Sequence, residues 1–427
     1  MTHSDVIVIG GGPAGSTLAT LLARKNRSVT LFEKERFPRF HIGESLLPCS
    51  VPLFAALGVL PKLDKGRFLA KHAAEFVTAD GSLRQRYAFA DGMIAGTPSA
   101  FEVDRGEFDQ VLLEHAAETG ARVEQETQVV RFECDLARGV EVVVRGPDGA
   151  ERTHTAECLV DASGQAALLP SRLGLRRMEP GLRNVAVFSH FEGAARSTGL
   201  AEGDISVVLV DEGWWWVIPL ANNRTSVGLV GPAKSFRGVK PDAAFFSEHI
   251  AKTPFVRDKL AGATRVAEVR TISDWSYKSS ALAGDRWLLV GDSGAFIDPV
   301  FSTGVQLGMT AAFDAAECLD RALAERRFER ARFIPYERRM RRFVDTYTDF
   351  VKGFYTPEFG ELILHPSNAF GLRAAVTSLL AGHGKKTLGM RLRVALFHAL
   401  VRLNRSLPLV PRLPERRAAF ASRAAAS

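Results

Sequence analysis

The stretch Val6-Ile7-Val8-Ile9-Gly10-Gly11-Gly12-Pro13-Ala14-Gly15 decides the fold of this chain. A continuous β-branched run leads into a glycine-rich turn, and a helical pattern follows over residues 16–24. This order is the strand, turn and helix of a dinucleotide-binding fold. Gly10 permits the tight turn, Gly12 lets the backbone approach a pyrophosphate, and Gly15 lets the helix pack closely on the strand. The sequence therefore predicts a nucleotide site at its first turn.

Two neighbouring features support this prediction. Pro13 and Ala14 belong to the glycine-rich turn, and the positive N-terminal end of the helix that follows attracts a phosphate anion. The second predicted strand, residues 29–32, ends at Glu33, ~20 residues after the glycine turn, where a carboxylate accepts hydrogen bonds from a ribose. Because NAD and FAD share this signature, the remainder of the chain must distinguish them.

Composition restricts the class of protein. The chain has 427 residues, 46% of them hydrophobic and 24% charged, which suits two or three globular domains. It shows neither a signal peptide nor a run of roughly 18 apolar residues, so we expect a cytoplasmic protein without a spanning helix. The four cysteines lack Cys-x-x-Cys spacing, and no metal site is predicted.

Charge is concentrated at the C-terminal end. Residues 385–427 contain ten Lys or Arg and one acid, Glu415, so this basic tail has a net charge of +9. The whole chain has a net charge of +7, which leaves about −2 for residues 1–384. We favour a terminal helix that covers the domain, with docking on an acidic carrier protein and contact with an anionic membrane surface as less favoured alternatives. The tail lacks interleaved stacking aromatics, so a nucleic-acid partner is not predicted.

Three further segments resemble the flavin-monooxygenase superfamily. They are Arg105-Gly106-Glu107-Phe108-Asp109, the predicted strand and turn at 158–164, and the strand at 287–293 that carries Asp292. The resemblance implies FAD, with Asp292 on the ribityl chain and Arg105 near the cofactor. Further FAD contacts implied by it are Arg39, Ser45, Val129, Pro299, Gly304 and Val305. No second glycine-rich loop follows a strand, so we expect a separate flavin reductase to supply FADH2.

Four motifs narrow the resemblance to the flavin-dependent halogenases, over about residues 1–385. They are Trp214-x-Trp216-x-Ile218-Pro219, Phe68-x-x-Lys71, the run from Gly291 to Val305, and Phe354-Tyr355-Thr356-Pro357-Glu358-Phe359-Gly360-Glu361-Leu362. The last motif is similar to members that act on phenols, pyrroles, and alkyl or acyl substrates. The chain lacks the extra length of the tryptophan halogenases, and Ala73 stands where members often have glycine. Free tryptophan is therefore a disfavoured substrate.

The halogenase resemblance assigns a role to each motif. FADH2 and O2 convert chloride or bromide to hypohalous acid at the flavin, and the acid travels to Lys71, the predicted catalytic residue. Backbone amides of Thr303 and Gly304, at a helix N-terminus, would hold the halide. Trp214 and Trp216 would keep organic substrate away from the flavin, whereas Trp215 lies on the opposite strand face.

The expected substrate is an electron-rich aromatic group such as a phenol or pyrrole, either free or tethered to an acyl or peptidyl carrier protein in natural-product biosynthesis. Three alternatives remain open at this point. One is an FAD-dependent aromatic hydroxylase, and another is an isoprenoid reductase or saturase that shares the early motifs. The third, suggested only by the basic tail, is a non-catalytic flavin-binding relative on a membrane or carrier protein.

The predicted fold class is α/β. A Rossmann-like FAD-binding domain of the aromatic hydroxylase and glutathione reductase type spans 1–310 and is interleaved with a β-sheet substrate domain at about 66–100 and 175–285. An α-helical C-terminal region follows over 311–427, including the basic tail at 385–427.

Overall fold

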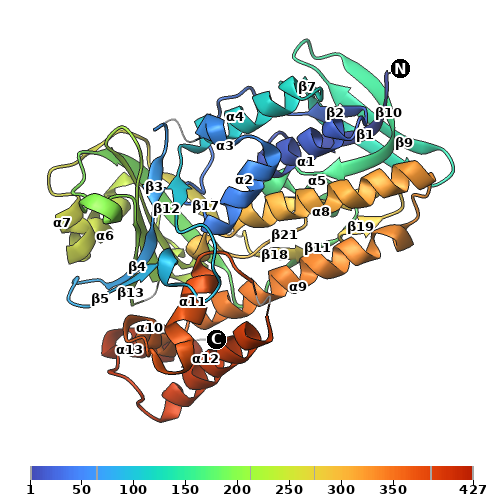
Figure 1. The fold of residues 1–427 in the computed structure, drawn as a ribbon. Helices are drawn as coiled ribbons and strands as arrows, with labels where there is room; N and C mark the ends of the chain where they lie inside the picture. Colours follow the sequence, from blue (N-terminus) through green and yellow to red (C-terminus); the bar gives the residue numbers. More distant parts are fainter. Residues whose placement is uncertain (1, 64–65, 212, 274, 385–386, 426–427) are drawn as a thin grey trace.

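A twisted, largely parallel sheet forms the nucleotide-binding half of the molecule, as Figure 1 shows. The computed structural model describes residues 2–63, 66–211, 213–273, 275–384 and 387–425. The path of the sheet runs β19-β20-β10-β1-β2-β7. Its strands are β1 (Thr2–Ile9), β2 (Val29–Phe32), β7 (Arg122–Glu124), β10 (Glu151–Asp161), β19 (Ala283–Gly284) and β20 (Trp287–Leu289), with β8 (Gln128–Asp135) and β9 (Gly139–Arg145) extending β10 in antiparallel fashion.

Buried β-branched residues explain why this sheet forms. Val6 and Val8 are fully buried in β1, which pairs in parallel with β10 on one side and with β2 on the other. Helices pack side by side along the sheet (Figure 1). They are α1 (Pro13–Arg24), α4 (Arg105–Glu118) and α8 (Gly304–Glu325). Helix α8 crosses the predicted boundary at residue 310, because the helical pattern already begins at Gly304.

A second, mostly antiparallel sheet lies beside the first. Its strands are β4 (Ala73–Thr78), β5 (Arg84–Ala88), β12 (Asn184–Glu192), β13 (Ile205–Val210), β14 (Gly213–Pro219), β15 (Arg224–Pro232), β16 (Thr264–Arg265) and β17 (Arg270–Ser273). Two helices, α6 (Ala243–Lys252) and α7 (Pro254–Lys259), contribute to the core on the face away from the nucleotide half. Strand alternation directs Trp215 into that core, where its ring lies 5.5 Å from the ring of Phe246.

Smaller elements connect the two halves. They include the two-stranded ribbon of β3 (Leu69–Lys71) and β6 (Ala100–Glu102), and a sheet of β11 (Arg176–Met178), β18 (Tyr277–Ser279) and β21 (Ala295–Phe296). Short helices α2 (Val51–Leu57), α3 (Leu60–Leu63) and α5 (Leu168–Arg172) complete this part. The ribbon is important for the site because it carries Lys71.

Helix α9 (Arg330–Phe354) packs along α8 and leads to the last helices, which lie together at the bottom of Figure 1. These are α10 (Pro357–Leu364), α11 (Leu372–Leu380), α12 (Leu388–Ser406) and α13 (Pro414–Ala425). Lys385 and Lys386, which begin the predicted basic tail, lie outside the described residues. Across the ranges that the structure describes, every helix is too short or too polar to span a bilayer.

Candidate active site

A large cavity lies between the two sheets and encloses about 480 Å³. Almost all of the predicted site residues meet in its wall. They are Gly10, Gly12, Pro13, Ala14, Glu33, Arg39, Ser45, Arg105, Val129, Trp214, Trp216, Asp292, Pro299, Thr303, Gly304 and Val305. The two exceptions are Gly15, which lies within the packing of α1, and Lys71, which lies behind the wall.

The glycine-rich turn has the shape that a pyrophosphate requires. Gly10 has φ +102°, and a Cβ there would lie 2.4 Å from the carbonyl oxygen of Ala162. A Cβ on Gly15 would lie 1.9 Å from the carbonyl oxygen of Gly10. A Cβ on Gly12, by contrast, would point toward the cavity, where the nearest atom is Arg39 Nη2 at 3.6 Å. Helix α1 starts here without a side-chain cap, so the residues fit the phosphates of a dinucleotide.

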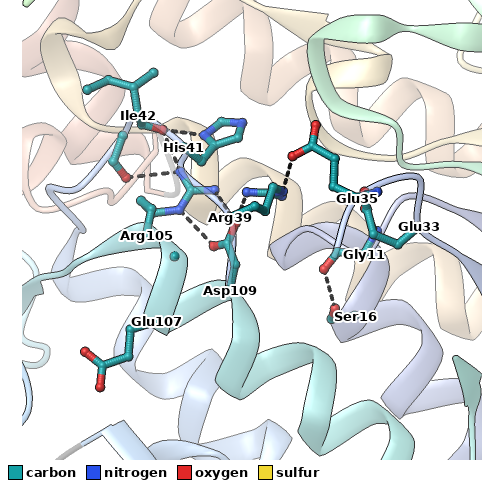
Figure 2. A network of polar contacts seen from close by, with 12 residues as sticks. Gly11, Ser16, Glu33, Glu35, Arg39, His41, Ile42, Arg105, Glu107 and Asp109 are labelled. Carbon is teal, nitrogen blue, oxygen red and sulfur yellow. Dashed lines mark hydrogen bonds and ion pairs between the residues drawn. The ribbon is translucent and has the colours of Figure 1, made fainter. Parts of the chain in front are cut away.

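Acidic and basic side chains form a network of polar contacts beside the glycine-rich turn, as Figure 2 shows. Glu33 accepts hydrogen bonds from the amides of Gly11 (2.7 Å) and Glu35 (2.8 Å), which holds its carboxylate at the end of β2. Arg105 binds Asp109 through two hydrogen bonds of 2.8 and 3.0 Å, and Arg39 reaches the same carboxylate at 3.0 Å. Burial would raise the pKa of Asp109, but the two arginines lower it, so the carboxylate stays charged.

Two ionisable groups of the wall have pKa values shifted by burial. The pKa of His41 falls to about 4, because burial and then the charge of Arg105 disfavour the imidazolium. His41 is therefore neutral at pH 7. The pKa of Asp292 rises to about 6 because burial outweighs the attraction of Arg105.

The predicted halide site lies where α8 begins. Ser302 has φ +56°, and this left-handed turn leads into Thr303 and the first helical residue, Gly304. Helix α8 has no side-chain cap, and both residues line the cavity. The arrangement suits a small desolvated anion at the positive end of a 22-residue helix.

The two cavity-facing indoles form a rigid wall. Their ring centroids are 6.0 Å apart, and each indole nitrogen donates a hydrogen bond. Trp216 Nε1 donates to Ser226 Oγ at 3.1 Å. Trp214 Nε1 donates to the hydroxyl of Tyr355 at 3.1 Å, and that hydroxyl donates to Asp298 Oδ2 at 2.8 Å. Both indoles are thus fixed by side chains from other elements.

Lys71 lies next to the cavity without lining it. Its side chain is 1% exposed, and its Nζ donates to Ser45 Oγ at 2.7 Å and to the carbonyl of Leu46 at 3.1 Å. The ring centroid of Phe89 lies 5.5 Å away. Burial lowers the pKa of Lys71, an effect that Glu102 and Asp204 oppose. Ser45 lines the cavity and also accepts the hydrogen bond from Lys71, so it connects the cavity with the buried lysine.

Sequence reasoning missed several residues that complete this site. Glu102 accepts a hydrogen bond from Ser45 Oγ at 3.0 Å. Glu44 lines the cavity, and its Oε1 lies 2.5 Å from Nε2 of His190. Asp298 and Tyr355 hold Trp214. An acidic residue in the short apolar run Ala100-Phe101-Glu102-Val103 was the available signal for Glu102. The other contacts depend on how distant elements pack.

Comparisons with known proteins agree with this geometry. A family model described as tryptophan halogenase matches residues 5–95 and 62–358. The chain is 32% identical over 376 residues to the 1H-pyrrole-2-carbonyl-[peptidyl-carrier protein] chlorinase of Pseudomonas fluorescens, covering 82% of this chain and 83% of that protein. It is 38% identical over 329 residues to a tryptophan 2-halogenase of Chondromyces crocatus, covering 76% of this chain and 62% of the relative.

A solved structure gives the same result. The myxobacterial chondrochloren halogenase, an FAD-dependent enzyme, superposes with a TM-score of 0.78 at 30% identity, covering 94% of this chain and 97% of that chain. These relatives lend no support to the hydroxylase or isoprenoid reductase alternatives, and the prediction of a halogenase is confirmed. The α/β fold with a Rossmann-like FAD domain and an adjoining β-sheet is confirmed as well. The chain belongs to the tryptophan halogenase family of flavin-dependent halogenases.

Proposed function

We propose that this enzyme makes hypohalous acid in the cavity and passes it by Ser45 to Lys71, which directs electrophilic halogenation of an electron-rich aromatic substrate. Reduced FAD, when bound, would supply two electrons to O2, which activates the oxygen to take two further electrons from chloride or bromide. The observation that carries the proposal is the buried Lys71 ammonium hydrogen-bonded to Ser45, a residue of the cavity wall. A buried lysine with a lowered pKa suits both hydrogen bonding to hypohalous acid and attack on its halogen.

The residues of the cavity separate the halide from the organic substrate. The start of α8 at Thr303 and Gly304 would hold chloride or bromide, as the uncapped helix end favours an anion. Trp214 and Trp216 would exclude an aromatic ring from the flavin, because both indoles are buried and held by hydrogen bonds. We infer that a separate flavin reductase supplies FADH2, since the sequence carries one glycine-rich nucleotide turn after a strand.

For the substrate we infer a phenol or pyrrole tethered to a carrier protein in natural-product biosynthesis. The Pseudomonas chlorinase acts on a pyrrole held by a peptidyl carrier protein, and this chain covers most of that relative. The outer face of α12 supports a partner: Leu388 is 72% exposed and Leu392 is 62% exposed, with Arg391 between them in the sequence. Further along the helix, Arg402 precedes the exposed Leu403. An apolar face with basic neighbours suits an acidic protein surface. The tryptophan 2-halogenase relative, in contrast, extends well beyond the length that this chain matches.

Replacement of the lysine tests the proposal. We expect Lys71→Met to retain FAD binding and oxidation of FADH2, and to lose halogenation of both free phenol and a pyrrolyl-loaded carrier protein by at least about 100-fold. Purified enzyme would be assayed with FAD, NADH, a flavin reductase, O2 and bromide, and products identified by mass spectrometry. Lys278→Met, at a partly exposed ion pair with Asp345, is the matched control. Normal halogenation by Lys71→Met would refute the role of Lys71, and hydroxylated product without halide would refute the activity.

A further inference from the structure

Lys71, Ser45 and Glu102 form a continuous chain of hydrogen bonds. Lys71 Nζ donates to Ser45 Oγ at 2.7 Å, and the same hydroxyl donates to Glu102 Oε1 at 3.0 Å. The three residues are 1%, 6% and 0% exposed. The donor order runs from the ammonium through the hydroxyl to the carboxylate, which is the order that a proton transfer requires.

Backbone pairing fixes this chain in place. Strand β3, which ends at Lys71, pairs with β6, which ends at Glu102, and Ser45 forms an isolated bridge with Glu102. Three extended segments thus present one side chain each to the same buried point. Ser45 lines the cavity, whereas the other two residues lie behind it. A change of protonation at Lys71 can therefore be compensated without contact with bulk water.

The other charged groups around Lys71 already have partners. Asp204 binds Arg86 Nε at 2.7 Å and accepts hydrogen bonds from the amides of His72 and Ala73. Glu44 is paired with His190. Among the described residues, Oε2 of both Glu44 and Glu102 lacks a hydrogen-bond partner, but it is Glu102 that accepts the hydrogen bond from Ser45. Glu102 is thus the carboxylate best placed to respond to the lysine.

Burial brings the proton affinities of the two groups toward each other. It lowers the pKa of Lys71 and raises the pKa of Glu102 to about 8, against the attraction between them. Two groups with converging pKa values exchange a proton at small cost, and the pair titrates as a unit.

We propose that Ser45 and Glu102 are positioning residues that form a proton relay, through which Lys71 gives up a proton and becomes the neutral amine that accepts halogen. The inference rests on the proposed role of Lys71. The ammonium proton moves to Ser45 Oγ while the serine proton moves to Glu102 Oε1, so a buried ion pair becomes a neutral pair. The serine hydroxyl is regenerated in the same step.

The later steps balance around the neutral amine. Its nitrogen attacks the halogen of hypohalous acid, an N–X bond forms, the O–X bond breaks, and hydroxide leaves as water with a proton from the nitrogen. The resulting N–X group transfers halogen to the aromatic carbon. That carbon loses its proton, which returns the amine, and the glutamic acid can then reprotonate it through Ser45.

The pH profile of Glu102→Gln tests the relay. The amide keeps an acceptor for Ser45 and removes the base. We expect bromination of phenol to fall at least about tenfold at pH 7 and to recover progressively toward pH 10, where hydroxide in the cavity can take the proton from Lys71 by way of Ser45, which lines the cavity. FADH2 oxidation and the release of hypobromous acid, measured with monochlorodimedone, should match the wild type. Ser45→Ala should also lower bromination at pH 7, because it interrupts the chain at its centre. Since Ser45 is a predicted FAD contact, the Kd for FAD is measured for this variant as well.

The controls separate this inference from the proposed function. Glu337→Gln replaces another buried glutamate, on α9, whose ion pairs lie outside the cavity wall, and should behave as the wild type. FAD absorbance and thermal unfolding verify that each variant is folded. If Lys71→Met is inactive while Glu102→Gln keeps the wild-type pH profile, the relay is wrong and the role of Lys71 stands. A loss of equal size at every pH would also overturn the relay. Full activity of Lys71→Met would overturn the proposed function itself.

Discussion

Tyr355 holds Trp214, one of the two indoles proposed to keep substrate away from the flavin. Its hydroxyl accepts from Trp214 Nε1 at 3.1 Å and donates to Asp298 Oδ2 at 2.8 Å, so it connects an indole of the cavity wall to a buried carboxylate. Burial raises the pKa of Asp298 to about 6, and the hydrogen bond from Tyr355 opposes that rise. Loss of the hydroxyl would leave both the indole N–H and the carboxylate short of a partner.

We therefore expect Tyr355→Phe to lower the free energy of unfolding by about 1–3 kcal/mol and to loosen Trp214. Urea denaturation measures the first effect, and the intensity and quenching of tryptophan fluorescence report the second. Tyr347→Phe is the matched control, because its buried hydroxyl donates a single hydrogen bond, to Leu379, away from the cavity. Equal quenching in both variants would show that Tyr355 does not hold the indole.

Pairing of two strands shapes the barrier at the scale of the element. Trp216 on β14 lies opposite Gly228 on β15, and a Cβ at Gly228 would lie 2.2 Å from the indole atom Cζ2. The glycine leaves the space into which the indole folds back across the sheet. Trp215, between Trp214 and Trp216, points to the core beneath α6 and α7, so β14 contributes side chains to both faces of the sheet.

Gly228→Ala should push the Trp216 ring toward the cavity. We expect unfolding to become easier by about 1–3 kcal/mol, as in other overpacked cores, and the Kd for FAD to rise several-fold. Thermal unfolding and a flavin absorbance titration would measure the two changes. Gly262→Ala, with open space around the added methyl, should leave both unchanged. An unchanged Kd in Gly228→Ala would mean that the indole moves elsewhere.

The basic tail joins the C-terminal helices to one another and to the second sheet. Glu361 on α10 is fully buried and binds Arg417 Nε and Nη2 of α13 at 2.6 and 2.7 Å, together with Asn404 of α12. Arg416 donates to the carbonyls of Val210 and Gly213, which flank the start of β14. The inward-facing charges of the tail are thus used within the fold, which agrees with a covering role, while the outer face of α12 stays exposed.

The ionisation of Glu361 determines how the stability of the C-terminal helices changes with pH. Burial would raise its pKa, but Arg417 and the amide of Leu413 lower it below the usual value. Its contribution to stability is therefore complete above about pH 5 and is lost as the pH falls through the lowered pKa. We expect Glu361→Gln to cost about 3 kcal/mol at pH 7, and the difference from the wild type to shrink below about pH 4. Glu358→Gln, whose ion pairs measure 3.5 and 3.8 Å, should cost much less. Denaturant unfolding across this pH range measures both variants. Equal free energies of unfolding for Glu361→Gln and Glu358→Gln would contradict the role given to Glu361.

The sequence by itself determined the nucleotide-binding fold and most of the cavity wall. The glycine turn at 10–15, Glu33 and the start of α8 are local patterns, in which propensity, backbone conformation and chemistry are all set by adjacent residues. The alternation of Trp214, Trp215 and Trp216 likewise follows from the two-residue period of a strand, and the structure directs the three indoles accordingly.

Tertiary structure alone decided that Lys71 lies behind Ser45 and that Glu102 completes the chain. The hydrogen bond between Lys71 and Ser45 spans 26 positions, and that between Trp214 and Tyr355 spans 141. Such contacts depend on strand register and on packing between elements, which no local pattern specifies. The same is true of the ionisation of Lys71 and Glu102, because desolvation arises when separate segments enclose both groups.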